Sequence, residues 1–304
     1  MLLPLGKRQL VFTRVVFVWQ WKFTAFFVLA SLAVTAAVEM WNLTFLQLPT
    51  LPLAVVGAAL GIFVSFRTNQ AYDRWWEGRK LWGRMINESR HWASQATKYV
   101  DDEETQRRLV HRHAAYVHAL RCLLRKQDPF ADEEFSARIA QVGDDIATLK
   151  EQTNLTHALL DQQLDDLVEL NRDGSLNDFR LQSMDNTLRE LINIQGGCER
   201  IKKTPMPPLY ALLANRLVEF YAVLFPLAVV HDMGWWTIPV NLLVCTAFSL
   251  IAEAGRVLED PFTMFFNALP LSAISRMIEV NVRQRLGEKG LPPMRTPDEN
   301  GLLM

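Results

Sequence analysis

Four stretches of the chain contain no charged residue, and they alternate with polar segments. Two of them, Met40–Phe66 and Met233–Ala252, reach the length of about 20 apolar residues that a membrane-spanning helix needs. Phe23–Val38 is shorter, and Tyr221–Val230 is the weakest because charged residues closely precede it. The pattern predicts four membrane-spanning helices, at 22–41, 50–68, 214–231 and 234–254.

Two other interpretations of these stretches are less favoured. Buried helices of a soluble protein seldom run 20 residues without a charge, because one face of such a helix normally meets water. A cleaved signal peptide at Met1–Val38 is disfavoured because the charged beginning is long and Lys22 interrupts the apolar part. We therefore expect a protein of the lipid bilayer.

Basic residues flank the expected spans on one side only, which predicts the orientation. They precede the first and third spans and follow the second and fourth, whereas the short loops on the other side lack Lys and Arg. Both termini and the polar insert are therefore expected in the cytoplasm. The predicted organisation is a cytoplasmic N-terminal segment (1–21), spans one and two (22–68), a cytoplasmic helical insert (69–213), spans three and four (214–254), a cytoplasmic helix (255–287) and a flexible tail (288–304).

The polar insert carries helix signals and no convincing alternating strand pattern. Asp101–Glu104 offers an N-cap and first-turn acids, and Ser175 with Asp178 fits a capping box before another helix. The proline-rich run Pro205–Pro208 should end that helix. The predicted fold class is all-α: four transmembrane helices plus a cytoplasmic helical bundle.

Composition and motifs argue against catalysis and nucleic-acid binding. The net charge is -1, which disfavours a basic nucleic-acid binder. The chain lacks the common nucleotide-binding, metalloprotease and nucleophile motifs, so we expect no enzyme, no cofactor and no metal. The three cysteines, which are isolated, are expected to be reduced structural thiols. The remaining candidates are interpreted as solvated surface residues: a possible histidine cluster of His111, His113 and His118, and the acidic pairs Asp144-Asp145 and Asp165-Asp166.

The second span has two neighbouring ridges. Small residues recur at Gly57, Gly61 and Ser65, which permits close helix packing in lipid. Beside them run Ala58, Ile62 and Phe66, an apolar ridge that could line a narrow pore and gate it by dewetting. By pattern alone, contact of this ridge with lipid or a neighbouring helix is the favoured interpretation.

The segment F-R-T-N-Q-A-Y-D-R-W-W-E-G-R-K-L-W-G at Phe66–Gly83 resembles the signature of the bestrophin family, most closely its bacterial branch. The four-span layout, the Pro205–Pro208 break and Glu259-Asp260-Pro261-Phe262 also agree with it. The resemblance implies a homopentameric ion channel of a bacterial inner membrane, and it changes the preferred role of the apolar ridge. The residues that it implicates are the pore neck (Ala58, Ile62, Phe66), a cytoplasmic constriction (Leu176 or Phe179) and structural signature residues (Arg67, Asn69, Asp73, Arg74, Trp75, Trp76).

Two departures from the family pattern limit what the resemblance implies. Animal members follow their Pro-Phe with aspartates that bind calcium, whereas Thr263–Phe266 offers no carboxylate here, so calcium activation is not expected. Ala58 stands where a bulkier aliphatic residue is usual. The expected permeant ions are small and inorganic: the bacterial branch favours monovalent cations, and the wider family favours chloride or other anions. The alternatives are a membrane-anchored scaffold whose insert binds partners and, more weakly, a secondary transporter.

Overall fold

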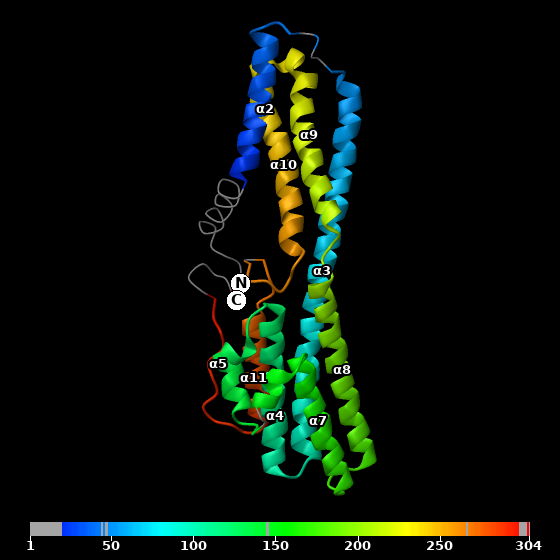
Figure 1. Cartoon of the computed structure of the whole chain (residues 1–304), viewed down its shortest axis with the longest axis vertical. Coiled ribbons are helices and arrows are strands. Elements are labelled where there is room, and N and C mark those ends of the chain that lie inside the picture. The colour runs from blue at the N-terminus through cyan, green and yellow to red at the C-terminus, as the bar shows by residue number, and fades with distance from the viewer. Residues whose placement is uncertain are drawn as a thin grey trace. The chain divides into compact units, whose positions relative to one another are not determined.

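The computed structural model describes residues 20–43, 45, 48–143, 146–265, 267–297 and 303 (Figure 1). The regular structure of these residues is helical, which confirms the predicted all-α fold. The helices are α2 (Trp21–Glu39), α3 (Thr50–Tyr99), α4 (Glu103–Leu124), η3 (Pro129–Ala131), α5 (Glu133–Ile139), α6 (Ile146–Glu151), α7 (Leu155–Arg172), α8 (Asp178–Lys203), α9 (Pro208–Met233), η4 (Gly234–Trp236), α10 (Thr237–Leu258) and α11 (Leu271–Arg285). Most of the predicted N-terminal segment, 1–19, lies outside the described residues.

The chain divides into two compact units. The first comprises 1–75 and 205–260, and the second comprises 76–204 and 261–304. The division therefore falls inside α3, which continues unbroken to Tyr99, and the expected end of the membrane span after residue 68 stays a prediction.

Three stretches of the described chain are long and apolar enough to cross a membrane. They are α2, α3 and the continuous stretch Pro208–Leu258, which contains α9, η4 and α10. Gly234 joins the last two long helices with a positive φ of 51°, a conformation that glycine adopts readily. The four predicted spans thus coincide with α2, the first part of α3, α9 and α10.

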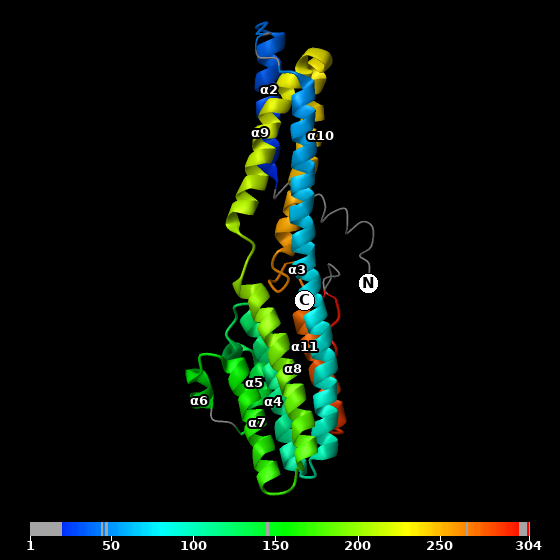
Figure 2. The same ribbon diagram turned by 90° about the vertical axis from the view of Figure 1, so that its right-hand side faces the viewer.

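Side chains from all four helices build the core of the first unit. Their helices lie side by side in both views (Figures 1 and 2). The buried members are Phe27, Leu53, Leu60, Val64, Val218, Tyr221, Ala222, Ala228, Cys245 and Ala252. The buried amide of Asn241 donates to the carbonyl oxygens of Phe27 and Ala222, both at 3.2 Å. This side chain on α10 therefore also links α2 and α9 in a setting where unpaired polar groups are costly.

Helix α4 is the centre of the second unit, where it packs against α5, α7, α8 and α11. Its predicted beginning is confirmed: the Asp102 carboxylate accepts from the Thr105 backbone N–H at 2.8 Å. The predicted capping box at Ser175 is wrong, because Asn177 caps α8 by accepting from Arg180 N–H. Ser175 and Asn177 both closely precede α8, and asparagine is as good an N-cap as serine. Helix α8 ends at Lys203, before the predicted proline break.

The beginning of the predicted flexible tail is anchored. Glu288 accepts from Arg283 at 2.6 Å, and Arg295 donates to Glu134 at 2.7 Å. Sequence pattern suggested flexibility because the segment is rich in proline and lacks an apolar periodicity, but an ion pair with a residue as distant as Glu134 does not show in that pattern. Residues 298–302 and 304 lie outside the described chain.

Candidate pore neck

The apolar ridge of α3 is exposed on the first unit. Ile62 and Phe66 keep 58% and 63% of their surface accessible, and Ala58 is also exposed. Together with neighbours one helical turn away, these residues border a shallow groove of about 430 Å³. The groove is lined by Ala58, Gly61, Ile62, Ser65, Phe66 and Asn69. Large apolar side chains in this position require cover from lipid, from another copy of the chain or from a narrow lumen.

The opposite face of α3 packs inside the unit. Leu60 and Val64 are buried in its core. A Cβ atom at Gly57 would lie 2.7 Å from the Tyr221 hydroxyl, and one at Gly61 would lie 3.5 Å from the Phe248 ring. These two glycines therefore bring α3 close to aromatic side chains of α9 and α10, as the small-residue stripe predicted. Ser65, the third member of the stripe, is exposed and lines the groove.

Two polar side chains fix the rotation of α3 about its own axis. Arg67 is 3% exposed, and its Nη1 donates to the carbonyl oxygen of Ala252 at 3.4 Å. Thr68 donates from Oγ1 to the carbonyl oxygen of Ile251 at 3.1 Å. Because both acceptors belong to α10, the buried face of α3 cannot turn outward without losing these bonds. Thr68 was missed by sequence reasoning, since threonine at a helix position has no distinctive pattern.

Arg74 of the signature contacts Glu259 within the first unit. Arg74 donates from Nε to the carbonyl oxygen of Glu259 at 3.1 Å, and the Glu259 carboxylate accepts from the Met206 backbone N–H at 3.1 Å. Glu259 therefore joins α3 to the proline-rich segment before α9. The structural role expected for Arg74 stays a prediction, which these bonds support.

The exposed ridge extends beyond the three predicted neck residues. Val55 lies seven residues before Ile62, and Asp73 lies seven residues after Phe66. Seven residues are nearly two helical turns, so both belong to the same face. Val55 is 64% exposed, and Asp73 is exposed as well. Sequence reasoning assigned Asp73 a bracing role and overlooked this heptad spacing, which was visible in the sequence.

Tyr72, Trp75 and Trp76 are aromatic residues of the signature on α3. Tyr72 and Trp75 stack with ring centroids 6.2 Å apart, and Trp76 is 47% exposed. Asn69 is exposed and borders the groove. The structural roles expected for Asn69, Trp75 and Trp76 stay predictions.

The two candidates for the cytoplasmic constriction differ in burial. Leu176 is 1% exposed and belongs to the interior of the second unit, whereas Phe179 is 85% exposed at the beginning of α8. A residue that narrows a lumen must present its side chain to it. The candidate constriction therefore reduces to Phe179.

The interpretation of the three α4 histidines as solvated is wrong. His111, His113 and His118 are at most 1% exposed. His118 contacts Glu279 at 3.0 Å and Glu134 at 3.3 Å, and His111 contacts Glu288 at 2.7 Å. Glu279 and Glu288 lie far along the chain from these histidines, so a local pattern could not reveal the pairs. The pair Asp165-Asp166 is only half solvated, since Asp166 accepts from Arg112 at 2.5 Å. Asp144 and Asp145 lie outside the described residues.

One part of this buried network has the spacing of a metal site. His118, Asp132 and Glu134 offer ligand atoms within 4.8 Å of one another. However, Asp132 accepts from Arg121 at 2.6 Å, and Glu134 accepts from Arg276 and Arg295. Burial alone would raise the pKa of Glu134, but its hydrogen bonds with His118, Arg295 and Arg276 hold it well below its usual value. Arginines so close to the carboxylates oppose a divalent cation, so the arrangement fits a structural ion-pair network.

Comparison with known proteins decides the family. Residues 9–284 match the family described as Bacterial/Fungal Bestrophin protein. The chain belongs to this bestrophin family. It is 34% identical over 248 residues to a Mesorhizobium japonicum protein named voltage-dependent anion channel-forming protein, covering 82% of this chain and 78% of that protein. A protein of the same name from Escherichia coli K12 is 30% identical over 272 residues, covering 90% of this chain and 88% of that protein.

The solved structures agree with this bestrophin assignment. The crystal structure of a bacterial bestrophin homologue from Klebsiella pneumoniae superposes with a TM-score of 0.81 at 29% identity, covering 88% of this chain and 98% of that chain. The family and the named relatives show an ion channel of a membrane, not an enzyme. The resemblance inferred from the signature is confirmed.

Proposed function

We propose that this bestrophin assembles as a homopentamer around a central pore whose neck is lined by the exposed ridge of α3. The observation that carries the proposal is the division of α3 into two faces. One face is buried and held by Arg67 and Thr68, while Ile62 and Phe66 on the other remain exposed. We place the channel in the bacterial inner membrane, with both termini in the cytoplasm, as the distribution of basic residues predicts.

Rotational symmetry converts each neck residue into a ring. Rings of Ile62 and Phe66 present only carbon to the lumen, and Ala58 adds a smaller ring. Water in a narrow apolar tube loses hydrogen bonds without compensation, so such a tube tends to empty and stop ions. The neck therefore acts as a hydrophobic gate, and a change of diameter or wetting opens it.

We propose that Asp73 sets the charge preference of this pore. The side chain lies on the same face as Phe66, about 10 Å further along the helix axis. In a symmetric assembly it forms a ring of carboxylates at the cytoplasmic mouth of the neck. Such rings attract cations and repel anions. This supports monovalent cations as the favoured ions, whereas the names of the curated relatives support anions as the alternative.

Planar bilayer recordings of the purified channel test the proposal. Stepwise currents are expected, and the sign of the reversal potential in a salt gradient reports whether cations or anions pass. Silence across a range of pH values and ions, from protein that is folded and assembled, would overturn the channel proposal. That result would favour the membrane-anchored scaffold, whose second unit binds cytoplasmic partners.

We also propose that opening needs no calcium. Calcium takes six to eight oxygen ligands, several of them from carboxylates. Thr263, Met264 and Phe265 provide none after Phe262, and the Glu259 carboxylate already accepts from Met206 N–H. Currents should persist in the presence of a calcium chelator. Currents that vanish with chelator and return with micromolar calcium would contradict this.

A further inference from the structure

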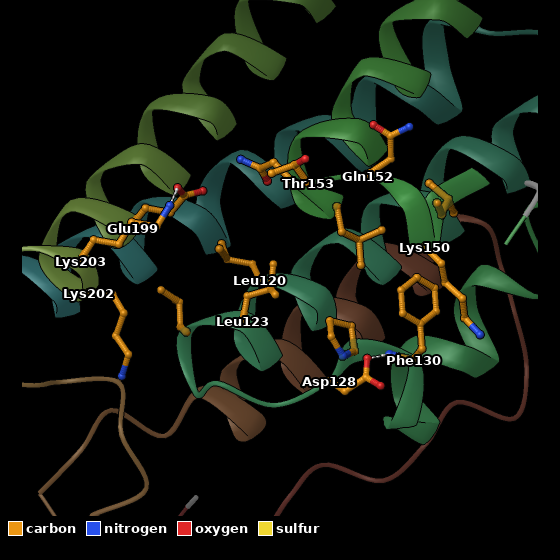
Figure 3. Close-up of a pocket in the computed structure, with 15 residues that line it drawn as sticks. Leu120, Leu123, Asp128, Phe130, Lys150, Gln152, Thr153, Glu199, Lys202 and Lys203 are labelled. Atoms are coloured by element: carbon orange, nitrogen blue, oxygen red, sulfur yellow. Dashed lines mark hydrogen bonds and ion pairs between the residues drawn. The ribbon is translucent and has the colours of Figure 1, made fainter. Parts of the chain in front are cut away.

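The second unit contains a pocket that the channel proposal does not use. It has a volume of about 490 Å³, within the range of roughly 300–1,000 Å³ typical of small-molecule sites. Figure 3 shows its lining, which comes from the end of α4, the segment Asp128–Phe130, the segment from Leu149 into α7, and the end of α8. All of these elements belong to one compact unit.

The floor of the pocket is apolar. Leu120, Leu124 and Leu149 are almost fully buried beneath it. Leu123 lies near the middle of the view in Figure 3 and keeps 41% of its surface exposed. Covering an exposed leucine inside a concave surface with an apolar group is favourable, because it removes apolar surface from water. The floor therefore suits an alkyl chain.

The rim carries more positive than negative charge. Lys150, Lys202 and Lys203 line it, against the carboxylates of Asp128 and Glu199. In Figure 3 the two lysines of α8 lie at one end of the leucine floor, and Lys150 lies with Phe130 at the other. The Lys150 ammonium is 5.3 Å from the centre of the Phe130 ring.

The two carboxylates of the rim are already engaged. Asp128 accepts from the Phe130 backbone N–H at 3.0 Å, and Glu199 accepts from Lys203 at 2.7 Å and from Gln195 at 2.8 Å. Burial alone would raise the pKa of Glu199, but these hydrogen bonds hold it below its usual value. Each lysine ammonium has three N–H donors, so Lys203 retains donors beyond its bond to Glu199.

We propose that this pocket binds an amphipathic anion, a molecule with one alkyl chain on the leucine floor and one acidic head group at the lysines of the rim. The charge of the rim selects an acidic head over a basic one, and the apolar floor selects an alkyl body over a small polar anion. A free fatty acid and an anionic phospholipid share this chemistry. Lys202 and Lys203 stand only a few residues before Pro208, where the candidate span α9 begins.

Photoaffinity labelling of the full-length channel in phosphatidylcholine nanodiscs tests the site. A palmitic acid carrying a diazirine in its chain is the probe, and peptide mass spectrometry locates the label. We expect labelling of the peptides that contain Leu123 and Thr153, and competition by unmodified palmitate. A diazirine hexadecanol, which lacks the charge, should label these peptides about fivefold less, as expected for the loss of one ion pair.

Matched variants separate the pocket from unspecific association. Leu123→Glu should abolish the labelling. Ile192→Glu, at a position of nearly equal exposure on α8 outside the pocket, should not. Lys150→Gln with Lys203→Gln should reduce it, unlike Lys80→Gln with Lys98→Gln. Label confined to the membrane spans, or equal labelling of all variants, would overturn the proposal.

Competition identifies the source of the ligand. Displacement by palmitate but not by dioctanoyl phosphatidylglycerol supports a free fatty acid, and displacement by phosphatidylglycerol at a lower concentration than palmitate supports a membrane lipid. Displacement by neither overturns the site. Because labelling is read without ion currents, its failure would leave the channel proposal intact, and a silent channel would leave the pocket intact.

Discussion

The Nη1 atom of Arg67 lies 3.4 Å from the carbonyl oxygen of Ala252, a contact between residues 185 positions apart in the sequence. It joins α3 to α10 and holds the buried face of α3 inward. Since the neck ridge occupies the opposite face, the same bond fixes the direction in which Ile62 and Phe66 project. The arginine of the family signature thus supports the pore without touching the proposed lumen.

Arg67→Met should therefore destabilise the folded channel. The substitution keeps an unbranched, flexible stem and removes the charged guanidinium, so it leaves no unpaired charge behind. We expect a loss of about 1–3 kcal/mol, the usual value for a hydrogen bond from a charged group. Thermal unfolding of the purified protein measures it. Arg90→Met, at an exposed position of the same helix, is the control, and an equal Tm for the two variants would contradict the anchoring role.

Two adjacent glycines of α8 should respond in opposite ways to alanine. A Cβ atom at Gly197 would lie 2.9 Å from Leu81, while one at Gly196 meets nothing within 4 Å. Gly197→Ala should cost about 1–3 kcal/mol through overpacking. Gly196→Ala should stabilise by up to about 1 kcal/mol, because alanine is the better helix former. Denaturant unfolding compares the two, and similar stabilities would show that Leu81 moves aside without cost.

The sequence predicted the parts of this molecule that depend on local periodicity. The charge-free stretches located the four apolar helices, and spacing by four located both ridges of α3. Hydropathy could not show that α3 continues to Tyr99, because a helix passes from an apolar to a polar setting without a break. The partners of His111 and His118 were also beyond local pattern, since Glu288 and Glu279 lie 177 and 161 residues away.

His113 should make the stability of the second unit depend on pH. Burial lowers its pKa from 6.5 to about 3, so it stays neutral in the folded state. In the unfolded chain, this histidine binds a proton below about pH 6.5. The folded state therefore has its full stability with respect to His113 above that pH and loses stability as pH falls toward 3. Between pH 6 and 5 the free energy of unfolding should fall by up to about 1.4 kcal/mol per pH unit from this group.

The variant His113→Phe should reduce this dependence, and chemical denaturation at pH 6 and pH 5 measures the difference. The informative quantity is the change of the free energy of unfolding with pH, because the substitution also changes packing against Trp92 and Tyr116 and so shifts stability at every pH. His157→Phe, at an exposed position of α7, should leave the slope unchanged. Equal slopes in wild type and His113→Phe would mean that His113 does not carry the effect.

Asp73→Asn should shift the reversal potential toward that of an anion-permeable pore. The substitution removes one negative charge from every subunit and preserves the size of the side chain. Because Asp73 is exposed on the monomer, folding stability should change by less than about 0.5 kcal/mol. Asp161→Asn, at an exposed position of α7, is the matched control. A loss of stability with unchanged selectivity would restore the bracing role that the sequence suggested.

Truncation of the neck should make the pore conduct more readily. Ile62→Ala and Phe66→Ala each remove a ring of large apolar side chains, which widens the tube and favours its wetting. We expect a higher open probability or conductance in single-channel recordings, with little change in selectivity because no charge is altered. Ala58→Gly should have little effect, whereas Ala58→Phe should narrow the outer part of the neck and reduce the current.

Control positions distinguish a pore lining from a lipid-facing surface. Phe220 on α9 and Leu243 on α10 are 65% and 72% exposed, as apolar and as accessible as the neck residues, but they do not lie on the ridge. Phe220→Ala and Leu243→Ala should leave single-channel currents unchanged. If Ile62 and Phe66 instead packed between subunits, truncation would cost about 2–5 kcal/mol of stability and spare conduction. Folded Ile62→Ala and Phe66→Ala channels with wild-type conductance and gating would therefore exclude the ridge from the pore.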